Sequence, residues 1–186
     1  MVSAHLIREW GSRLIGKPML RVMRQGVLMQ VLARWTAFAL FFLPTVAATA
    51  APFESARTIA GTPFSSAGEV TIVHYWATWC APCRLEMPIL DAYYRKHHAQ
   101  GLAMLAISID QDASNRKLQE ATSRFAFPVA RVDDVKLPRR DIPTAIPVTR
   151  VYDRGGKLVF QTKGDGRTIL DSATLERSVS PLLTGR

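Results

Sequence analysis

The chain contains two cysteines, Cys80 and Cys83, and both lie at one junction. Residues 70–76 before them are mainly β-branched and aromatic, which is typical of a strand. From residue 81 to about residue 98, apolar side chains recur at helical spacing. The sequence therefore predicts a strand that leads directly into a helix, with the cysteine pair at the start of that helix.

This position suits thiol chemistry. A cysteine at a helix N-terminus lies near unpaired N–H groups and the positive end of the helix dipole, which stabilise the thiolate. Pro82 falls in the first turn, where a missing N–H costs little. Cys80 would attack a substrate disulfide, and Cys83, one turn later, would resolve the mixed disulfide.

The cysteine pair has two alternative interpretations, a structural bridge and a metal site. A purely structural bridge would close a very small loop and so stabilise little. A metal site would need further ligands, and although His74, His97 and His98 are present, no second ligand pair has the spacing of a zinc finger. Redox chemistry is the favoured interpretation.

The rest of the pattern predicts an α/β domain with a central mixed β-sheet flanked by helices. We expect strands, helices and a hairpin in the order β-α-β-α-β-β-β-α, after a possible short strand at 57–60. The later elements are a buried strand at 102–109, a helix at 114–125, a strand at 128–132, a Gly-Gly hairpin of 148–152 with 157–162, and a helix at 172–183. The pairs Asp133-Asp134 and Arg139-Arg140 are interpreted as parts of a solvated polar loop.

The N-terminal 50 residues have the parts of an export signal. Residues 1–34 carry six basic side chains and one acid, residues 35–51 are 17 residues without charge, and Ala48-Thr-Ala50 fits a cleavage site. We predict a signal peptide over 1–50, followed by a domain over 51–186 that is exported to the periplasm. The alternative is an uncleaved inner-membrane anchor at 35–51, since 17 residues is the short limit of a span.

The basic charge resides largely in that segment. The whole chain has a formal net charge of +9, whereas residues 51–186 hold 18 basic and 14 acidic side chains, a net charge of +4. This remaining charge is spread along the chain without an aromatic-interleaved basic stripe. Nucleic-acid binding is therefore not expected.

The motif Tyr-Trp-Ala-Thr-Trp-Cys-x-Pro-Cys-x-x-Glu-x-Pro, at 75–88, resembles the thioredoxin superfamily, specifically exported thiol:disulfide oxidoreductases of the TlpA/ResA type. Residues 107–110, 145–149 and 151–157 resemble the second core strand, the cis-proline loop and the last hairpin of that family. The resemblance covers about 53–183. It implies a thioredoxin fold for residues 51–186.

The family's cis-proline faces the two cysteines and binds the substrate backbone. Pro147 is assigned to this position because the family's turn Asp follows six residues later, as Asp153 does here, and Ile146 and Pro147 are therefore expected to bind the substrate. Pro143 is the competing candidate, since its local sequence also fits.

Four further residues are expected around the cysteines. Glu86 falls where this family carries an acid near the thiols, and the alternative is a solvated residue of the first helical turns. His74 stands where thioredoxins often have a buried Asp or Asn, either as a proton shuttle for Cys83 or as a core histidine. Trp76 and Trp79 would give packing and an apolar substrate surface around Cys80.

The resemblance implies a periplasmic reductase of protein disulfides, with apocytochrome c thiols as possible clients. Because the periplasm is kept oxidising, such a reductase needs electrons from a membrane thiol carrier. No cofactor is expected beyond the Cys80–Cys83 disulfide, and contact with the membrane is expected only through the N-terminal segment. The alternatives are a disulfide oxidase or isomerase, and a non-enzymatic copper-handling module that uses the same thiols.

Overall fold

The computed structural model describes residues 52–167 and 169–185. The predicted signal or anchor segment, with its boundary at residues 50 and 51, lies outside this part of the chain. None of the helices within these described residues combines the length and apolar character that crossing a membrane requires.

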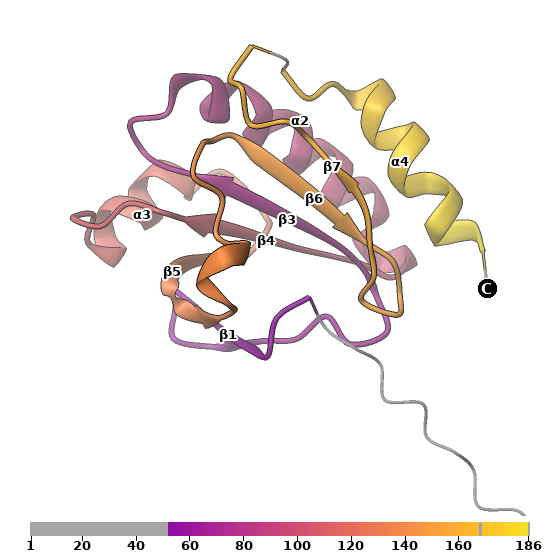
Figure 1. The fold of residues 1–186 in the computed structure, drawn as a ribbon, viewed down its shortest axis with the longest axis horizontal. Coiled ribbons are helices and arrows are strands. Elements are labelled where there is room, and N and C mark those ends of the chain that lie inside the picture. Colours follow the sequence, from indigo (N-terminus) through magenta and orange to yellow (C-terminus); the bar gives the residue numbers. More distant parts are fainter. Residues whose placement is uncertain (1–51, 168, 186) are drawn as a thin grey trace, which may run out of the picture. The chain divides into compact units, whose positions relative to one another are not determined.

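A seven-stranded mixed sheet forms the centre of the fold (Figure 1). Its order is β2-β1-β5-β4-β3-β6-β7. The neighbours β3, β4 and β5 are parallel, and the other pairs are antiparallel. The strands are β1 (Ser55–Thr58), β2 (Pro63–Phe64), β3 (Val70–Trp76), β4 (Leu102–Ser108), β5 (Val129–Lys136), β6 (Val148–Tyr152) and β7 (Leu158–Gln161).

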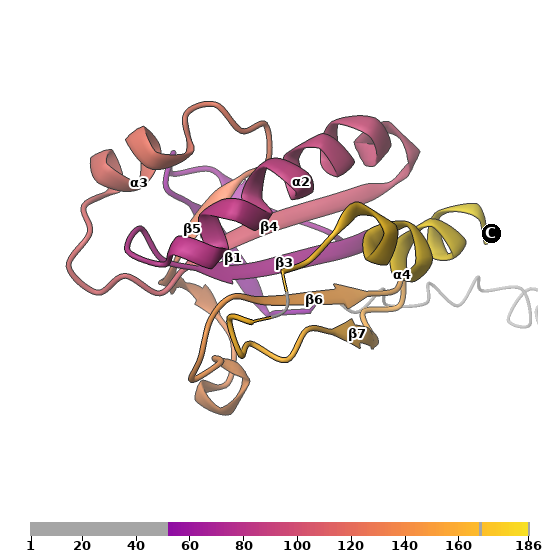
Figure 2. The same cartoon turned by 90° about the horizontal axis from the view of Figure 1, so that it is seen from above.

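Three helices cover one face of this sheet: α2 (Ala81–His97), α3 (Asn115–Thr122) and α4 (Ser172–Thr184). Figure 2 shows them together above the sheet. The chain passes from β3 through α2 to β4 and through α3 to β5 while moving in one direction across the sheet, so right-handed crossovers put both helices on the same side. Their apolar faces pack on β3 and β4 through residues that include Met87, Leu90, Leu118, Leu175 and Val179.

The opposite face has a smaller core under irregular chain. Phe53 lies just before β1 and Ala56 lies within it. Both belong to a cluster with residues of the central strands, namely Val73, Tyr75 and Ile107. The connection from β5 to β6, which contains the 3-10 turn η3 (Arg139–Asp141), lies on this side of the sheet in Figure 2. The absence of a long helix from this described face leaves the helix face as the main hydrophobic core.

The alternation along β3 determines where its histidine points. Ile72 and Trp76 belong to the cluster beneath the helices, whereas Val73 and Tyr75 belong to the cluster on the opposite face. Because side chains alternate along a strand, His74 lies on the helix side, between Ile72 and Trp76. Every residue of β3 is buried, which is why the sequence pattern alone does not reveal this orientation.

The α/β class and the element order are confirmed, with several boundaries corrected. The first strand is 55–58 rather than 57–60, and the two-residue β2 was not predicted. Helix α3 ends at Thr122 and not at residue 125. The Phe125 N–H bonds the Thr122 carbonyl in a turn that follows the helix. β5 continues to Lys136 because its polar end pairs with β1, so Asp133-Asp134 lies in a strand and not in a loop.

Candidate active site

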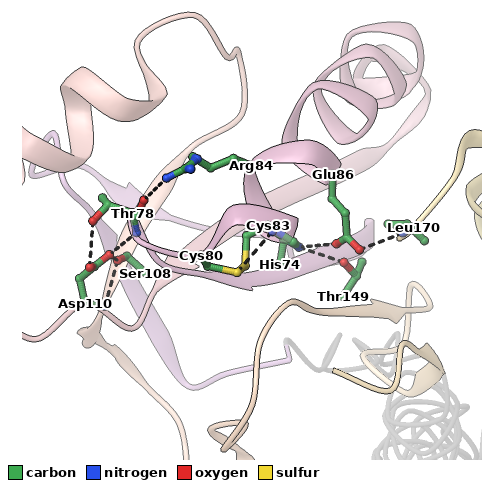
Figure 3. The surroundings of a disulfide bond; sticks show 10 residues. All are labelled: His74, Thr78, Cys80, Cys83, Arg84, Glu86, Ser108, Asp110, Thr149 and Leu170. Atoms are coloured by element: carbon green, nitrogen blue, oxygen red, sulfur yellow. Dashed lines mark hydrogen bonds and ion pairs between the residues drawn. A yellow bond between two sulfur atoms is a disulfide. The ribbon is translucent and has the colours of Figure 1, made fainter. Parts of the chain in front are cut away.

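Cys80 and Cys83 form a disulfide at the N-terminus of α2 (Figure 3). Cys80 is the N-cap residue, and its sulfur accepts a hydrogen bond from the Cys83 N–H at 3.3 Å. Pro82 lies in the first turn, as predicted. Cys80 is 4% exposed and Cys83 is fully buried, so Cys80 is the more accessible residue of the two.

The loop before Cys80 is fixed by a polar cluster that the sequence analysis did not assign. The Asp110 carboxylate accepts hydrogen bonds from the Thr78 N–H at 2.8 Å, the Thr78 hydroxyl at 3.1 Å and the Ser108 hydroxyl at 2.9 Å. Arg84, from the first turn of α2, donates to the Thr78 carbonyl at 2.7 Å. This cluster ties the end of β4 to the loop that carries Cys80.

The two tryptophans differ in exposure. Trp79, next to Cys80, is 67% exposed and presents its ring to solvent. Trp76 is 1% exposed and belongs to the core beneath the helices, so the expected contribution of Trp76 to a substrate surface is corrected. Its position on the helix face of β3 is the reason, since α2 covers it. Ile146 is half-buried and packs against the core cluster that contains both cysteines.

His74 is completely buried in the middle of β3. Its Nδ1 hydrogen-bonds the Thr149 hydroxyl at 2.9 Å across the β3–β6 pair, in which the two residues are direct register partners. Its Nε2 has no hydrogen-bond partner. Burial lowers the pKa of His74 to about 3, so the imidazole is neutral near neutral pH.

Glu86 is also buried, with 1% of its surface exposed, which excludes the solvated alternative. Its Oε1 accepts a hydrogen bond from the Leu170 N–H at 2.8 Å, and its Oε2 lies 3.8 Å from His74 Nδ1 without a hydrogen-bond partner. Burial raises the pKa of this carboxyl group, and the bond from Leu170 lowers it by a smaller amount. Figure 3 shows His74, Cys83 and Glu86 gathered below the first turns of α2.

The peptide bond between Ile146 and Pro147 is cis, and it is the one cis bond among the residues that the structure describes. The assignment of the cis-proline to Pro147 rather than Pro143 is confirmed. Pro147 directly precedes β6, and Thr149, two residues later, is the partner of His74. Thr149 of β6 therefore links the strand that follows the cis-proline to the buried His74 through a hydrogen bond.

The connection from β7 to α4 also reaches the site, which the sequence analysis missed. Gly164 has φ 71°, and a Cβ there would lie 2.7 Å from Val148 Cγ2 and 3.2 Å from the Ala145 carbonyl oxygen, so only glycine fits against the cis-proline loop. A Cβ on Gly166 would lie 3.8 Å from Pro82 Cγ. The Gly-x-Gly spacing, Gly164-Asp-Gly166, is the signal that could have suggested a close backbone approach.

No group of three or more His, Cys, Asp or Glu side chains within 52–167 and 169–185 is arranged to hold a metal ion. His97 and His98, at the end of α2, hydrogen-bond to neighbours near that helix end. They are not brought to the cysteines.

Comparison with known proteins agrees with this geometry. Thiol-disulfide oxidoreductase ResA of Bacillus thuringiensis subsp. konkukian is 26% identical over 98 residues, 53% of this chain and 57% of the relative. Sporulation thiol-disulfide oxidoreductase A of Bacillus subtilis is 23% identical over 107 residues, 55% of this chain and 65% of the relative. The chain thus spans less than two thirds of the length of these curated relatives.

Solved structures share the fold over more of the chain. A thiol:disulfide interchange protein of the thioredoxin family from Chlorobium tepidum superimposes with a TM-score of 0.57 and 26% identity, over 73% of this chain and 97% of that structure. A secreted disulfide oxidoreductase of Mycobacterium tuberculosis gives a TM-score of 0.59 at 20% identity, over 70% and 97% of the two chains.

The sequence pattern of the AhpC/TSA family matches residues 46–160, from before the first strand into β7. This range is more than half of the chain, and it includes the disulfide, Glu86 and the cis-proline loop. The chain therefore belongs to the AhpC/TSA family and has the thioredoxin fold.

Proposed function

We propose that the protein is an exported thiol:disulfide oxidoreductase in which Cys80 attacks and Cys83 resolves. The observation that carries the proposal is the disulfide at the start of α2, in which Cys80 is 4% exposed and Cys83 is fully buried. The more accessible sulfur meets the client, and the buried one is protected from reaction with a second client. The relatives named as thiol-disulfide oxidoreductases support the same chemistry.

The proposed direction is reduction of client disulfides. The Cys80 thiolate attacks a client disulfide, the Cys80–client bond forms, and the first client sulfur leaves and takes up a proton. Cys83 then loses its proton and attacks the Cys80 sulfur, which releases the second client sulfur as a thiol. The client gains two electrons and two protons, and the protein is left as the Cys80–Cys83 disulfide. No cofactor beyond this disulfide enters the reaction.

The compact β4–β6 region supports a reductase over an oxidase of the DsbA class. Such oxidases carry a large helical insertion there, whereas this chain has the eight-residue helix α3, strand β5 and the turn η3. We place the domain in the periplasm, with contact with the membrane only through the N-terminal segment. A membrane thiol carrier would return electrons to the Cys80–Cys83 disulfide, and apocytochrome c thiols awaiting haem are a proposed client class.

Around the cysteines, the proposed client surface is formed by Trp79 and the cis-proline loop. The exposed ring of Trp79 offers apolar contact beside Cys80. Residues next to Pro147 would pair with the client backbone as an added strand. Ile146, the half-buried residue before Pro147 in this loop, would contact the client together with Pro147.

The reduction potential of the Cys80–Cys83 couple tests the direction. A potential near the about −270 mV of thioredoxin is expected, and a potential near the about −120 mV of DsbA would overturn the reductase assignment in favour of an oxidase. Equilibration with glutathione or dithiothreitol buffers, read by thiol alkylation, gives this value.

A second measurement tests the chemistry itself. The purified protein is expected to catalyse reduction of insulin disulfides by dithiothreitol, and the double variant Cys80→Ala/Cys83→Ala is the matched control. Catalysis that the double variant retains, or purified protein with stoichiometric copper on the thiols and no catalysis, would contradict the proposal. The copper result would instead support a metal-handling module.

A further inference from the structure

Residues 143–146, just before the cis-proline and here called the pre-proline segment, have backbone groups that the rest of the protein does not use. Within the described part of the chain they take part in no backbone–backbone hydrogen bond, and Thr144 and Ala145 are exposed. Unused backbone groups at the surface can pair with an extended partner, which then lies against the protein as an added strand.

The pre-proline segment lies at the end of the sheet that carries the disulfide. Val148, the first residue of β6, is the register partner of Tyr75 near the end of β3, from which the chain leads to Cys80. The β7–α4 connection approaches both the Ala145 carbonyl and Pro82 in the first turn of α2. A client bound along this segment would therefore lie close to Cys80.

Arg150 of β6 fixes the chain where it enters the pre-proline segment. Its Nη1 donates a hydrogen bond of 2.6 Å to the carbonyl of Asp141, the last residue of η3. Asp141 lies nine residues before Arg150, so this bond ties the entry of the segment to the strand that follows its exit. The chain between them, which includes the cis-proline, is thereby closed into a short loop.

The guanidinium group of Arg150 is itself held by the two strands beside β6. Its Nε donates to Gln161 Oε1 of β7 at 2.7 Å, and its Nη1 also donates to the Tyr75 hydroxyl of β3 at 3.4 Å. Its Cζ lies 5.1 Å from the centre of the Tyr75 ring. The register partner of Arg150 is Val73, which belongs to the cluster on the sheet face opposite the helices. Arg150 therefore holds the loop from beneath the sheet, away from the two sulfurs.

The partners of this arginine are uncharged. They are a backbone carbonyl, a side-chain amide and a phenol, and burial raises the pKa of Tyr75 to about 12. None of the ion pairs between described residues includes Arg150. Hydrogen bonds from a charged donor are stronger than those between neutral groups. The arrangement is thus suited to fixing the position of the chain rather than to balancing a carboxylate.

We propose that Arg150 is a positioning residue for client binding, which holds the pre-proline segment where its backbone pairs with the backbone of a client polypeptide. The inference rests on the proposed function. Arg150 takes no part in the exchange of sulfur bonds, because it acts through the Asp141 carbonyl on the loop. A disulfide with no peptide backbone should therefore react independently of Arg150.

The test compares a peptide disulfide with a disulfide that has no peptide backbone. Wild type and Arg150→Leu each catalyse reduction of a fluorescence-quenched disulfide peptide by dithiothreitol, and KM and kcat are measured. We expect Arg150→Leu to raise KM about tenfold and to change kcat less than about twofold, because an interaction that holds the client equally before and during reaction affects KM alone. With 2-hydroxyethyl disulfide, the rates of the two proteins should agree within about twofold.

A matched arginine variant separates positioning from general damage to the fold. Arg154 also donates to backbone carbonyls, those of Gly68 before β3 and Leu183 in α4. Arg154→Leu should therefore lower stability by an amount similar to Arg150→Leu while KM for the peptide stays within about twofold of wild type. Thermal unfolding of both variants measures the structural contribution independently.

Two smaller changes locate the effect at the Asp141 carbonyl. Gln161→Ala removes the β7 partner of Arg150 but leaves the bond to Asp141, and it should raise KM less than about threefold. Arg150→Lys keeps a cation that can donate to the same carbonyl, although one nitrogen cannot also bond Gln161, and it should restore KM to within about threefold of wild type.

A second peptide tests whether the effect passes through the client backbone. In this peptide the backbone nitrogens on both sides of the cysteine are methylated, which removes the N–H groups that would pair with the pre-proline segment. Wild type should bind it less tightly than the unmodified peptide. Arg150→Leu should raise KM for the methylated peptide less than about twofold, because the interaction that Arg150 supports is already lost.

Three results would overturn the inference while leaving the proposed function intact. They are an unchanged KM for the peptide in Arg150→Leu, an equal loss of activity toward the peptide and 2-hydroxyethyl disulfide, and an equal effect of Arg150→Leu on the two peptides. If wild type reduced neither kind of disulfide, the proposed function would fail and the inference with it.

Discussion

Two buried carboxyl groups flank the disulfide, and they are partnered very differently. Asp110, at the end of β4, accepts three hydrogen bonds from Thr78 and Ser108. Glu86, on α2, accepts one, and its second oxygen has no partner. A saturated carboxylate stabilises one conformation, whereas an unsaturated one retains the capacity to bind a proton. The Asp110 side chain therefore fixes the loop of Cys80, whereas one oxygen of the Glu86 carboxyl group is left without a hydrogen-bond partner.

The largest expected effect comes from the sulfurs between the two clusters. Cys80→Ala should lower the rate of client reduction by roughly a thousandfold or more, because the attacking group is lost. The Cys83→Ala variant retains the attacking thiol of Cys80 but cannot resolve the mixed disulfide, so Cys80–client disulfides should accumulate. Non-reducing gels and mass spectrometry would detect these adducts and identify the clients. Adducts recovered through Cys83 in Cys80→Ala, with none through Cys80 in Cys83→Ala, would reverse the assignment.

Burial of His74 should make the folded protein less stable in acid. An unfolded histidine binds a proton below about pH 6.5, whereas the folded one, with a pKa of about 3, does not, so unfolding is favoured as the pH falls through that window. Between pH 6.5 and 4, the free energy of unfolding of wild type should fall by about 3 kcal/mol more than that of His74→Leu.

Urea unfolding of the disulfide-intact proteins at several pH values measures this difference. If the free energies of unfolding of wild type and His74→Leu changed in parallel with pH, burial would not lower the pKa of His74. The prediction would then be wrong.

Removal of the Asp110 carboxylate should lower the stability of the folded protein. Asp110→Ala leaves the Thr78 N–H and two hydroxyl groups without an acceptor, and we expect a loss of about 2 kcal/mol in the free energy of unfolding. Asp110→Asn retains one carbonyl acceptor and should lose less. Asp133→Asn, at an exposed site of β5, is the matched surface control. A cost no larger than that of the control would mean that Asp110 does not fix the loop.

The smallest expected effect is that of Glu86→Gln on stability, and it has a distinctive sign. Because the pKa of Glu86 is raised in the folded protein, folding holds its proton more tightly, and stability falls as the pH rises above the ordinary value of 4.5. Glu86→Gln should remove this decline and be at least as stable as wild type at pH 7. Glu120→Gln, on the exposed side of α3, is the control. A loss at pH 7 comparable with Asp110→Ala would place both carboxyl groups in the same structural role.

Much of the fold followed from local patterns. The strand at 70–76, the helix from Ala81 and the buried strand after Gly101 were identified by periodicity and turn residues, because these elements are long and end at clear signals. The sequence predicts that this strand ends at Val132, because Asp133-Asp134 has low strand propensity, whereas β5 continues to Lys136. Pairing with β1, more than 70 residues earlier, overrides that propensity.

Parts of the site could not be read from the chain in the same way. Glu86 was compatible with either a solvated or a buried position, since an acid in the second turn of a helix suits both. The decision comes from Leu170, 84 residues away, whose N–H meets its carboxylate. Asp110 ends the segment that resembles the family's second core strand, and no local pattern links it to its partner Thr78, which is 32 residues distant.

From the sequence, adjacent residues were enough to indicate that a strand leads into a helix that begins at the Cys80–Cys83 pair, and the resemblance to a known family indicated that Pro147 is the cis-proline. The packing of segments that are distant in the sequence determines that His74 faces α2, that Trp76 is covered, and that the β7–α4 connection lies against Pro82 and the cis-proline loop. The physical reason is that a strand buried on both faces has no polar-apolar alternation to reveal its orientation, and contacts between distant segments leave no local pattern.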